Sequence, residues 1–259
     1  MIIEVSDPAD PRLADYVGLR DSQLRRREDR FIAEGLKIIE RSFAAGCRPR
    51  SLLLQPRWLD GVLPLLDGQG DVPIYVGTEQ MIEEVSGFHV HRGALGAFER
   101  PVETSWEDLL AMRRLIVCEE TVDHANLGAI IRVGAALGWD GLIVSPGSAD
   151  PLYRRAIKAS MGASLEFPWR RMASDADLER LSAAGFTVVA STISPGAVTL
   201  DGYEAPERVA LLLGTEGDGL SSGWLEAADV HVTIPMTNRV DSLNVATAAA
   251  ILAHALRDS

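Results

Sequence analysis

Short apolar runs alternate with helical patterns through the second half of the chain, and this alternation is the strongest constraint on its fold. The expected strands are residues 115–118, 141–144, 186–190, 209–213 and 230–234. Segments 127–137, 152–163 and 242–256 carry helical periodicity. Continuous Val, Ile and Leu strands that alternate with helices are typical of a mostly parallel α/β sheet covered on both faces. Ligands of such sheets bind in the loops beyond the carboxyl ends of the strands.

The first hundred residues predict a second, smaller α/β unit. The expected strands are 51–54, 73–76 and 94–98, and the expected helical segments are 31–43, 58–66 and 78–85. Thr78 is a good N-cap for the last of these helices, and Gly46 follows the first. The polar stretch 99–105 is the best candidate for a linker. We therefore expect two domains, 1–104 and 105–259.

Cysteine content and hydropathy narrow the class of protein. Cys47 and Cys118 form no CxxC motif and no Cys/His cluster, so no metal site is expected. Cys118 lies in an apolar run, where a buried thiol is the plain interpretation, and two isolated cysteines fit a reducing compartment. No apolar stretch is long enough to span a bilayer, and the N-terminus lacks the pattern of a secretory signal. We therefore expect a cytoplasmic protein.

Charge is distributed unevenly along the chain. The formal net charge is −12, which argues weakly against nonspecific binding of nucleic acid. Residues 12–57, however, contain eleven Lys or Arg against six Asp or Glu, with Arg25, Arg26 and Arg27 at the centre. A solvated helix face and an RNA-docking surface both explain such a segment.

Residues 123–132 form the first of three notable loops at expected strand ends. Asn126 is a suitable N-cap for the helix that follows. Arg132 falls beside the expected apolar stripe of that helix, where an unpaired guanidinium would be costly, so we expect an anionic partner. The residues leave open whether this partner is a structural carboxylate or a bound anion.

Residues 211–221, LLLGTEGDGLS, form the second loop. Three glycines after a buried strand let the backbone approach a ligand closely, and Gly214 is the first of them. The loop is neither a Walker A motif nor a GxGxxG fingerprint. Glu216 and Asp218 would repel a phosphate, so a ligand with positive character, or one that binds through backbone hydrogen bonds, suits this loop better. A tight turn that needs glycine only for its geometry is the alternative.

Residues 234–245 form the third loop, which leads into the last helix. Asp241 or Ser242 is the expected N-cap of this helix. Its apolar stripe consists of Val245, Ala248, Ala249, Leu252 and Leu256. Such an alanine-rich stripe fits either plain core packing or the close helix approach of a dimer interface.

In this order, the segments NLGAIIR, LLLGTEGDGLS and IPMTNRVDSLNVATAAAI resemble the three motifs of the SpoU/TrmH family of RNA ribose 2′-O-methyltransferases, within the SPOUT superfamily. The resemblance covers about residues 115–256. More loosely, the N-terminal unit, with its segment RFIAEG at 30–35, resembles the L30e-like substrate-binding domain often attached to these enzymes. One departure is Asp123-His124-Ala125, where the family often has Asp-Pro.

The resemblance implies a C-terminal parallel sheet with a deep trefoil knot and S-adenosylmethionine as cofactor. By motif position, the residues that would hold the cofactor are Gly214, Ile234, Leu243, Leu213, Met236 and Thr192. The family assigns activation of the ribose hydroxyl to the position of Arg132. A guanidinium stays protonated, so stabilising the developing alkoxide is one role, and acting as base beside a bound phosphate is another. Asn126, Glu216, Ser242 and Asn244 would position it and the ribose.

The implied partners are RNA and a second copy of the chain, because family active sites combine residues of two chains. Ribosomal RNA (23S) is favoured over transfer RNA because of the L30e-like domain. Arg25, Arg26, Arg27 and Arg154 are the residues expected to bind RNA. The alternatives are a noncatalytic RNA-binding protein that keeps the knotted fold and, more remotely, a nucleotide-dependent oxidoreductase.

Overall fold

The computed structural model describes residues 1–19, 30–90, 93–237 and 242–257. The chain forms two compact units. Unit 1 consists of Met1–Val102 together with Leu152–Lys158, and unit 2 consists of Glu103–Pro151 and Ala159–Ser259. The predicted linker therefore contains the first crossing between the units. The short segment at 152–158 was expected in the C-terminal domain, but its contacts assign it to unit 1.

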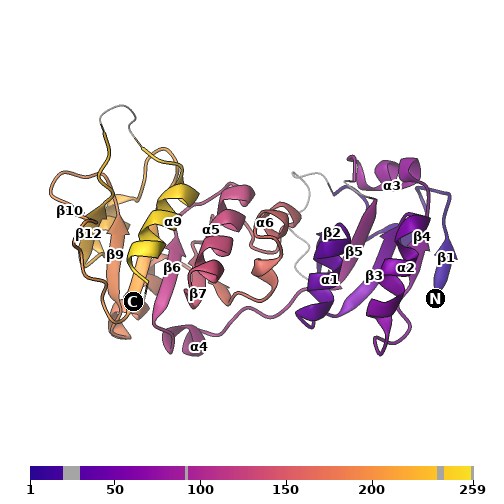
Figure 1. Cartoon of the computed structure of the whole chain (residues 1–259), viewed down its shortest axis with the longest axis horizontal. Coiled ribbons are helices and arrows are strands. Elements are labelled where there is room, and N and C mark those ends of the chain that lie inside the picture. Colours follow the sequence, from indigo (N-terminus) through magenta and orange to yellow (C-terminus); the bar gives the residue numbers. More distant parts are fainter. Residues whose placement is uncertain (20–29, 91–92, 238–241, 258–259) are drawn as a thin grey trace. The chain divides into compact units, whose positions relative to one another are not determined.

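Unit 1 is built on a five-stranded mixed sheet in the order β1-β4-β3-β5-β2 (Figure 1). Its strands are β1 (Ile2–Glu4), β2 (Arg30–Glu34), β3 (Pro49–Leu54), β4 (Ile74–Val76) and β5 (Ala94–Glu99). Strands β1, β4 and β3 are parallel, whereas β5 is antiparallel to both β3 and β2. Its helices are α1 (Leu36–Ala44), α2 (Leu59–Val62), α3 (Glu79–Ser86) and most of α6 (Arg154–Ala159).

The helical pattern expected from residue 31 was wrong at its start. Phe31 and Ile32 belong to β2, where Ile32 pairs with Ala97 of β5. Gly35 then turns the chain with a φ of 90°, and only after it does helix α1 begin. The apolar spacing suited a helix locally, but pairing with a strand more than sixty residues away decides the structure. By contrast, Thr78 caps α3 as predicted, since its Oγ1 accepts a hydrogen bond from the Met81 amide.

An ion cluster attaches the segment 152–158 to the rest of unit 1. The Glu34 carboxylate, whose side chain is only 4% exposed, accepts hydrogen bonds from Arg154 Nη1 at 2.9 Å and Lys158 Nζ at 3.0 Å. The Arg154 guanidinium also lies over the Phe88 ring, 3.9 Å from its centroid. These contacts neutralise a buried acid, because an isolated buried carboxylate would be strongly destabilising.

Unit 2 is built on a seven-stranded, all-parallel sheet in the order β10-β12-β9-β11-β6-β7-β8. The strands are β6 (Arg114–Cys118), β7 (Gly141–Val144), β8 (Trp169–Arg171), β9 (Thr187–Ser191), β10 (Val198–Thr199), β11 (Val209–Leu213) and β12 (Val230–Thr233). The parallel α/β sheet predicted from the sequence is confirmed. The two strands at its edges, β8 and β10, were not predicted, because both are short and their residues are partly exposed.

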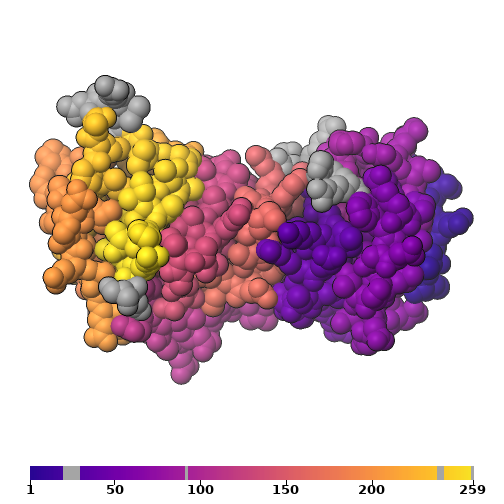
Figure 2. Space-filling model, viewed as in Figure 1, coloured from indigo at the N-terminus to yellow at the C-terminus, as the bar shows by residue number. Residues whose placement is uncertain are grey.

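The helices of unit 2 are α4 (Trp106–Leu110), α5 (His124–Ala136), α7 (Glu179–Ala183), α8 (Ser222–Glu226) and α9 (Val245–Ala255). Helices α5 and α9 pack side by side (Figure 1). In the space-filling view, α9, in yellow, borders α5 on the surface of the molecule (Figure 2). Within the described residues, no helix is both long and apolar enough to cross a membrane.

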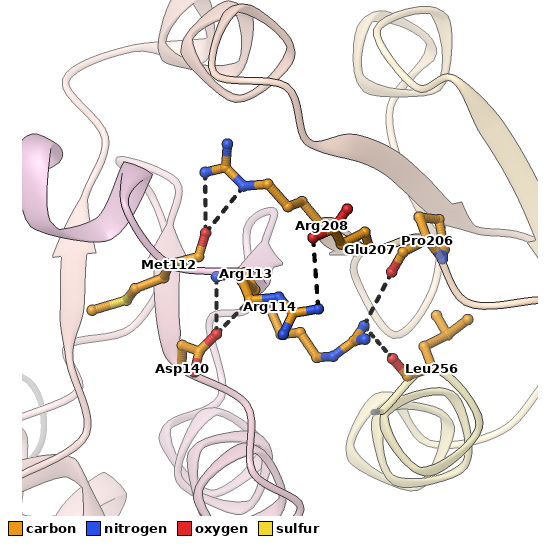
Figure 3. A network of polar contacts seen from close by, with 8 residues as sticks. All are labelled: Met112, Arg113, Arg114, Asp140, Pro206, Glu207, Arg208 and Leu256. Atoms are coloured by element: carbon orange, nitrogen blue, oxygen red, sulfur yellow. Dashed lines mark hydrogen bonds and ion pairs between the residues drawn. The ribbon is translucent and has the colours of Figure 1, made fainter. Parts of the chain in front are cut away.

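The C-terminal end of α9 is held at the base of the sheet. Trp139 Nε1 donates to the carbonyl oxygen of Ala253 at 3.0 Å. Close by, the Asp140 carboxylate accepts hydrogen bonds from the backbone amides of Arg113 and Arg114, where β6 begins (Figure 3). These contacts fix one end of α9, and its other end reaches the carboxyl edge of the sheet, where the candidate site lies.

Candidate active site

A cavity lies at the carboxyl ends of β9, β11 and β12, which is where a parallel sheet is expected to bind ligands. It is bounded by three chain segments that follow these strands and by the start of α9. Its lining includes Ser191, Thr192, Ile193, Ser194, Leu213, Gly214, Leu220, Leu225, Ile234, Met236, Ser242, Leu243 and Val245, together with residues 215–219. The walls are mainly apolar, and the lining also includes Glu216 and Asp218.

All of the predicted cofactor-binding residues line this cavity. They are Thr192 after β9, Leu213 and Gly214 at the end of β11, Ile234 and Met236 after β12, and Leu243 before α9. Glu216 and Ser242, two of the predicted catalytic residues, line it as well. The structure therefore brings together residues separated by up to fifty-one positions in the sequence.

Gly214 is required for a reason other than the one expected from the sequence. A Cβ atom at this position would overlap the backbone of Gly219 and Leu220 and would not project into open ligand space. The loop closes on itself here, because the Thr215 amide donates to the Gly219 carbonyl at 3.0 Å and Thr215 Oγ1 accepts from the Asp218 amide at 3.2 Å. The glycine thus permits a compact loop whose tip, at Glu216 and Gly217, is exposed.

A second pocket is also lined by this loop. It is lined by Glu120, Thr121, Val122, Asp123 and Asn126, and it shares residues 214–218 and Val245 with the first cavity. The two cavities therefore adjoin at this loop. A ligand in the second pocket would therefore lie next to a ligand in the first.

Asn244 joins the residues at this boundary. Its Nδ2 group donates to Asn126 Oδ1 at 3.1 Å and to Glu216 Oε1 at 2.5 Å. Its Oδ1 atom accepts from the amides of Ala246 and Thr247, so Asn244 is also the N-cap of α9. The sequence-based assignment of this cap to Asp241 or Ser242 was wrong, since Asn244 occupies it; Asp241 itself lies outside the described residues.

Asp123, and not Asn126, is the N-cap of α5. Its Oδ1 atom accepts a hydrogen bond of 2.8 Å from the Asn126 amide. Asn126 therefore lies inside the first turn of the helix, and its side chain is available to the Asn244 amide group. The two short polar residues were both acceptable caps by type, and the sequence interpretation chose the wrong one.

Arg132 is exposed on α5, contrary to the expectation that it lies beside the apolar stripe, from which an anionic partner was inferred. The buried side of this helix consists of Leu127, Ile130, Ile131 and the close-packed Gly134. Arg132 lies away from these residues, and within the part of the chain that the structure describes it forms no ion pair. Its guanidinium is therefore open to an external ligand.

Two side chains of this region were missed by the sequence interpretation. Glu119 is 7% exposed, and its Oε2 atom accepts from the Ser221 amide at 2.8 Å, which holds the far end of the Gly214 loop. Glu120 lines the second pocket. The sequence did contain a signal for these two residues, because a pair of carboxylates directly follows a buried strand. Cys118, just before them, is buried as expected, and burial raises the pKa of its thiol to about 12.

Of the predicted RNA-binding residues, the structure describes Arg154 alone. Arg25, Arg26 and Arg27 fall outside the described residues. Arg154 belongs to unit 1, and its side chain, 12% exposed, is engaged by Glu34. Among the described residues, Arg154 lines neither cavity.

The fold and the paired cavities define a class of protein: a parallel α/β domain with two adjoining cavities beyond the carboxyl ends of its strands. The family follows from comparison with known proteins. Residues 113–254 match the SpoU rRNA Methylase family, and this chain belongs to that family.

Similar proteins extend over both units. A Mycobacterium bovis protein named as an uncharacterized tRNA/rRNA methyltransferase is 40% identical over 259 residues, covering 96% of this chain and 89% of that protein. The 23S rRNA (guanosine-2′-O-)-methyltransferase RlmB of Salmonella typhi is 30% identical, covering 78% of this chain and 86% of that protein. The crystal structure of an AdoMet-bound rRNA methyltransferase from Sinorhizobium meliloti matches with a TM-score of 0.85 at 27% identity, covering 98% of this chain and 97% of that one.

Proposed function

We propose that this chain is an S-adenosylmethionine-dependent RNA methyltransferase that modifies a ribose 2′-hydroxyl, with 23S ribosomal RNA as its substrate in preference to transfer RNA. One observation carries the proposal: Asn244 bridges Asn126 and Glu216 at the boundary between two adjacent cavities. Group transfer needs donor and acceptor held side by side in a fixed geometry, and this boundary is suited to that task.

The first cavity fits S-adenosylmethionine. Leu213, Ile234 and Leu243 offer an apolar slot for the adenine ring. Glu216 and Asp218, which also line the cavity, are compatible with a cationic ligand and unfavourable for a phosphate. When bound, the cofactor supplies a methyl group attached to a positively charged sulfur.

Arg132, which lines neither cavity, and the residues at the boundary would prepare the acceptor hydroxyl. Arg132 is exposed and lacks an ion pair within the described residues, so its guanidinium is available to stabilise negative charge that develops on the ribose oxygen. Asn126, Glu216, Asn244 and Ser242 would hold the ribose and the loop in place. Such oriented donors act without reorganising during the reaction.

Unit 1 would dock the RNA as an L30e-like domain. Its sequence contains the basic segment around Arg25, Arg26 and Arg27 on an otherwise acidic chain. Contacts between arginines and phosphates release counterions and so make binding depend on salt. Since Arg154 is engaged by Glu34, we assign docking to these three arginines first. The ribosomal substrate is supported by the name of the RlmB relative.

We also propose a homodimer formed through unit 2, and a C-terminal knot as in the SPOUT superfamily. Helices α5 and α9 carry exposed or half-buried small residues such as Ala125, Ala129 and Ala250, and Ile251 of α9 is 38% exposed. A second copy could approach such a surface closely. Sedimentation equilibrium tests the dimer, and a monomer at micromolar concentration would contradict it.

Methyl transfer from radiolabelled S-adenosylmethionine to ribosomal and transfer RNA tests the proposed function, with mapping of the modified nucleotide. The sharpest variant is Asn244→Ser, because serine is also a good N-cap but is too short to bridge Asn126 and Glu216. We expect nearly unchanged thermal stability and a loss of activity of at least about tenfold. Binding of S-adenosylmethionine and RNA without any transfer would instead support the noncatalytic RNA-binding alternative.

A further inference from the structure

Two adjacent carboxylates after β6, those of Glu119 and Glu120, accept hydrogen bonds from two different loops. Glu119 accepts from the Ser221 amide and so holds the loop that follows β11. Glu120 turns the other way, because its backbone adopts a φ of 44°, in the left-handed region that residues with a side chain rarely occupy. Within the described residues, only Glu120 and Met161 are non-glycine residues with positive φ. Such a conformation costs about 1 to 3 kcal/mol and persists only where surrounding contacts enforce it.

The contacts of Glu120 are with the loop that follows β7. Glu120 Oε1 accepts from Ser145 Oγ at 2.8 Å and from the Gly147 amide at 3.1 Å, while the Glu120 amide donates to Ser145 Oγ at 2.8 Å. The carboxylate lies directly over Gly147, since a Cβ atom there would overlap Glu120 Oε2. The φ of Gly147 is not positive, so its backbone does not require glycine. A side chain at this position would instead fill the space that the Glu120 carboxylate occupies.

The loop that receives Glu120 is itself held rigidly. Arg171, at the end of β8, donates to the carbonyl oxygens of Ser145, Pro146, Ser148 and Ala149 at 2.8–3.1 Å. One guanidinium thus holds the backbone of the whole loop. A fixed loop gives the Glu120 carboxylate a fixed place to dock.

The same contacts set the wall of the second pocket. The Thr121 carbonyl accepts from the Ala149 amide at 2.9 Å, and the Thr121 amide donates to Ser148 Oγ at 3.2 Å. Thr121, Val122 and Asp123 then line the pocket, and Asp123 caps the helix that carries Asn126. The position of this wall relative to Asn126 therefore depends on how Glu120 is anchored.

The lining of this pocket indicates which part of an RNA could enter it. It contains the carboxylates of Glu120, Asp123, Glu216 and Asp218 and no Lys or Arg among its described residues. A phosphate would be repelled, whereas a neutral nucleoside offers hydroxyl and base donors that carboxylates accept.

We propose that the second pocket receives the acceptor nucleoside, and that Glu120 is a positioning residue that fixes its wall by docking on Ser145 and Gly147. The inference rests on the proposed methyltransferase function and adds to it the residue that aligns the acceptor. Glu120 acts through the wall and takes no part in the transfer itself.

Three variants test the role of Glu120. Glu120→Gly permits the left-handed backbone at no cost but removes the carboxylate, so the fold should be kept while kcat falls at least about tenfold. Glu120→Gln keeps an oxygen acceptor and should retain kcat within about threefold of wild type. Gly147→Ala should displace the carboxylate and reproduce the loss seen for Glu120→Gly. In all three, the Kd for S-adenosylmethionine should stay within about twofold, because neither Glu120 nor Gly147 lines the first cavity.

The double variant Glu120→Gly with Gly147→Ala gives the decisive result. If both act by removing one contact, the double variant should be no worse than either single one. Three results would each overturn the proposal. The losses of kcat in the two single variants could multiply in the double variant, kcat could be unchanged in Glu120→Gly, or the affinity for S-adenosylmethionine could fall as much as kcat.

Amide hydrogen exchange over residues 119–126 provides a readout that does not depend on activity. Exchange should be faster in Glu120→Gly and Gly147→Ala and close to wild type in Glu120→Gln. A wild-type protein that binds S-adenosylmethionine but methylates no RNA would refute the proposed function, and with it the acceptor role of the pocket. Unchanged exchange in an active protein would refute the anchoring alone.

Discussion

Arg114, the first residue of β6, donates a hydrogen bond of 2.6 Å to the carbonyl oxygen of Leu256, the residue that follows α9 (Figure 3). Arg114 is 4% exposed, so a buried guanidinium satisfies a backbone acceptor that the helix end leaves without an intrahelical partner. Since Asn244 caps the opposite end of α9, this contact and the cap hold the same helix at its two termini.

Arg114→Met should destabilise the protein, because the Leu256 carbonyl loses a buried donor. We expect the free energy of unfolding to fall by about 1 to 3 kcal/mol in urea denaturation. Arg113→Met is the matched control. The Arg113 side chain is 53% exposed, and its ion pair with Glu207 spans 4.0 Å at the surface, so the change should stay within about 0.5 kcal/mol. Equal losses in the two variants would contradict this account.

Gly214→Ala should weaken S-adenosylmethionine binding at least about tenfold, because the added Cβ pushes against the Gly219 and Leu220 backbone and opens the loop. Gly217→Ala, in the same loop, is the control. Its Cβ would meet no atom within 4 Å and its φ is ordinary, so the affinity should change less than about twofold. Isothermal titration measures both. The loop argument fails if the two alanine variants bind alike.

Arg132→Ala should separate catalysis from stability. The side chain is exposed, so we expect the free energy of unfolding to change by less than about 0.5 kcal/mol. Methyl transfer should fall at least about a hundredfold, as expected when a group that stabilises developing charge is lost. S-adenosylmethionine affinity should remain within a few fold. A near wild-type transfer rate would remove Arg132 from the reaction.

Cys118 should make stability depend on pH at alkaline values. Burial raises the pKa of its thiol from 9.0 to about 12, so the folded protein holds this proton more tightly than the unfolded chain. The contribution is complete below pH 9 and is lost as the pH rises towards 12. Between pH 8 and 10, wild type should lose about 1 kcal/mol more than Cys118→Ala. Parallel curves for the two proteins in urea denaturation would contradict the assignment.

The apolar strands of unit 2 were predictable because burial on both faces leaves a continuous signal in the sequence. Strand β11 has the predicted bounds, and β7 matches as well. Strand β2 was not predictable in this way, since Ile32 is extended only because β5 pairs with it. The motifs named residues that the structure brings together around one cavity, and their role in holding the cofactor stays a prediction.

Local sequence could not decide the polar details of the site. Asp123 and Asn126 are both plausible caps, and the choice depends on Asn244, which lies 118 positions later and occupies the Asn126 side chain. The exposure of Arg132 depends on which side of α5 faces the core. Glu120 gave no sign of its left-handed backbone, because that conformation is imposed by the loop after β7.

The short segment 152–158 determines where the protein can be cut into fragments that fold. Along the chain it interrupts unit 2, yet Arg154 and Lys158 neutralise Glu34 of unit 1. A fragment that ends at Val102 would keep the acid and lose both cations, and so would bury an uncompensated charge. Neither unit is therefore formed by one continuous stretch of the chain. An isolated N-terminal half would need a neutral residue in place of Glu34, or a graft of the missing basic turn.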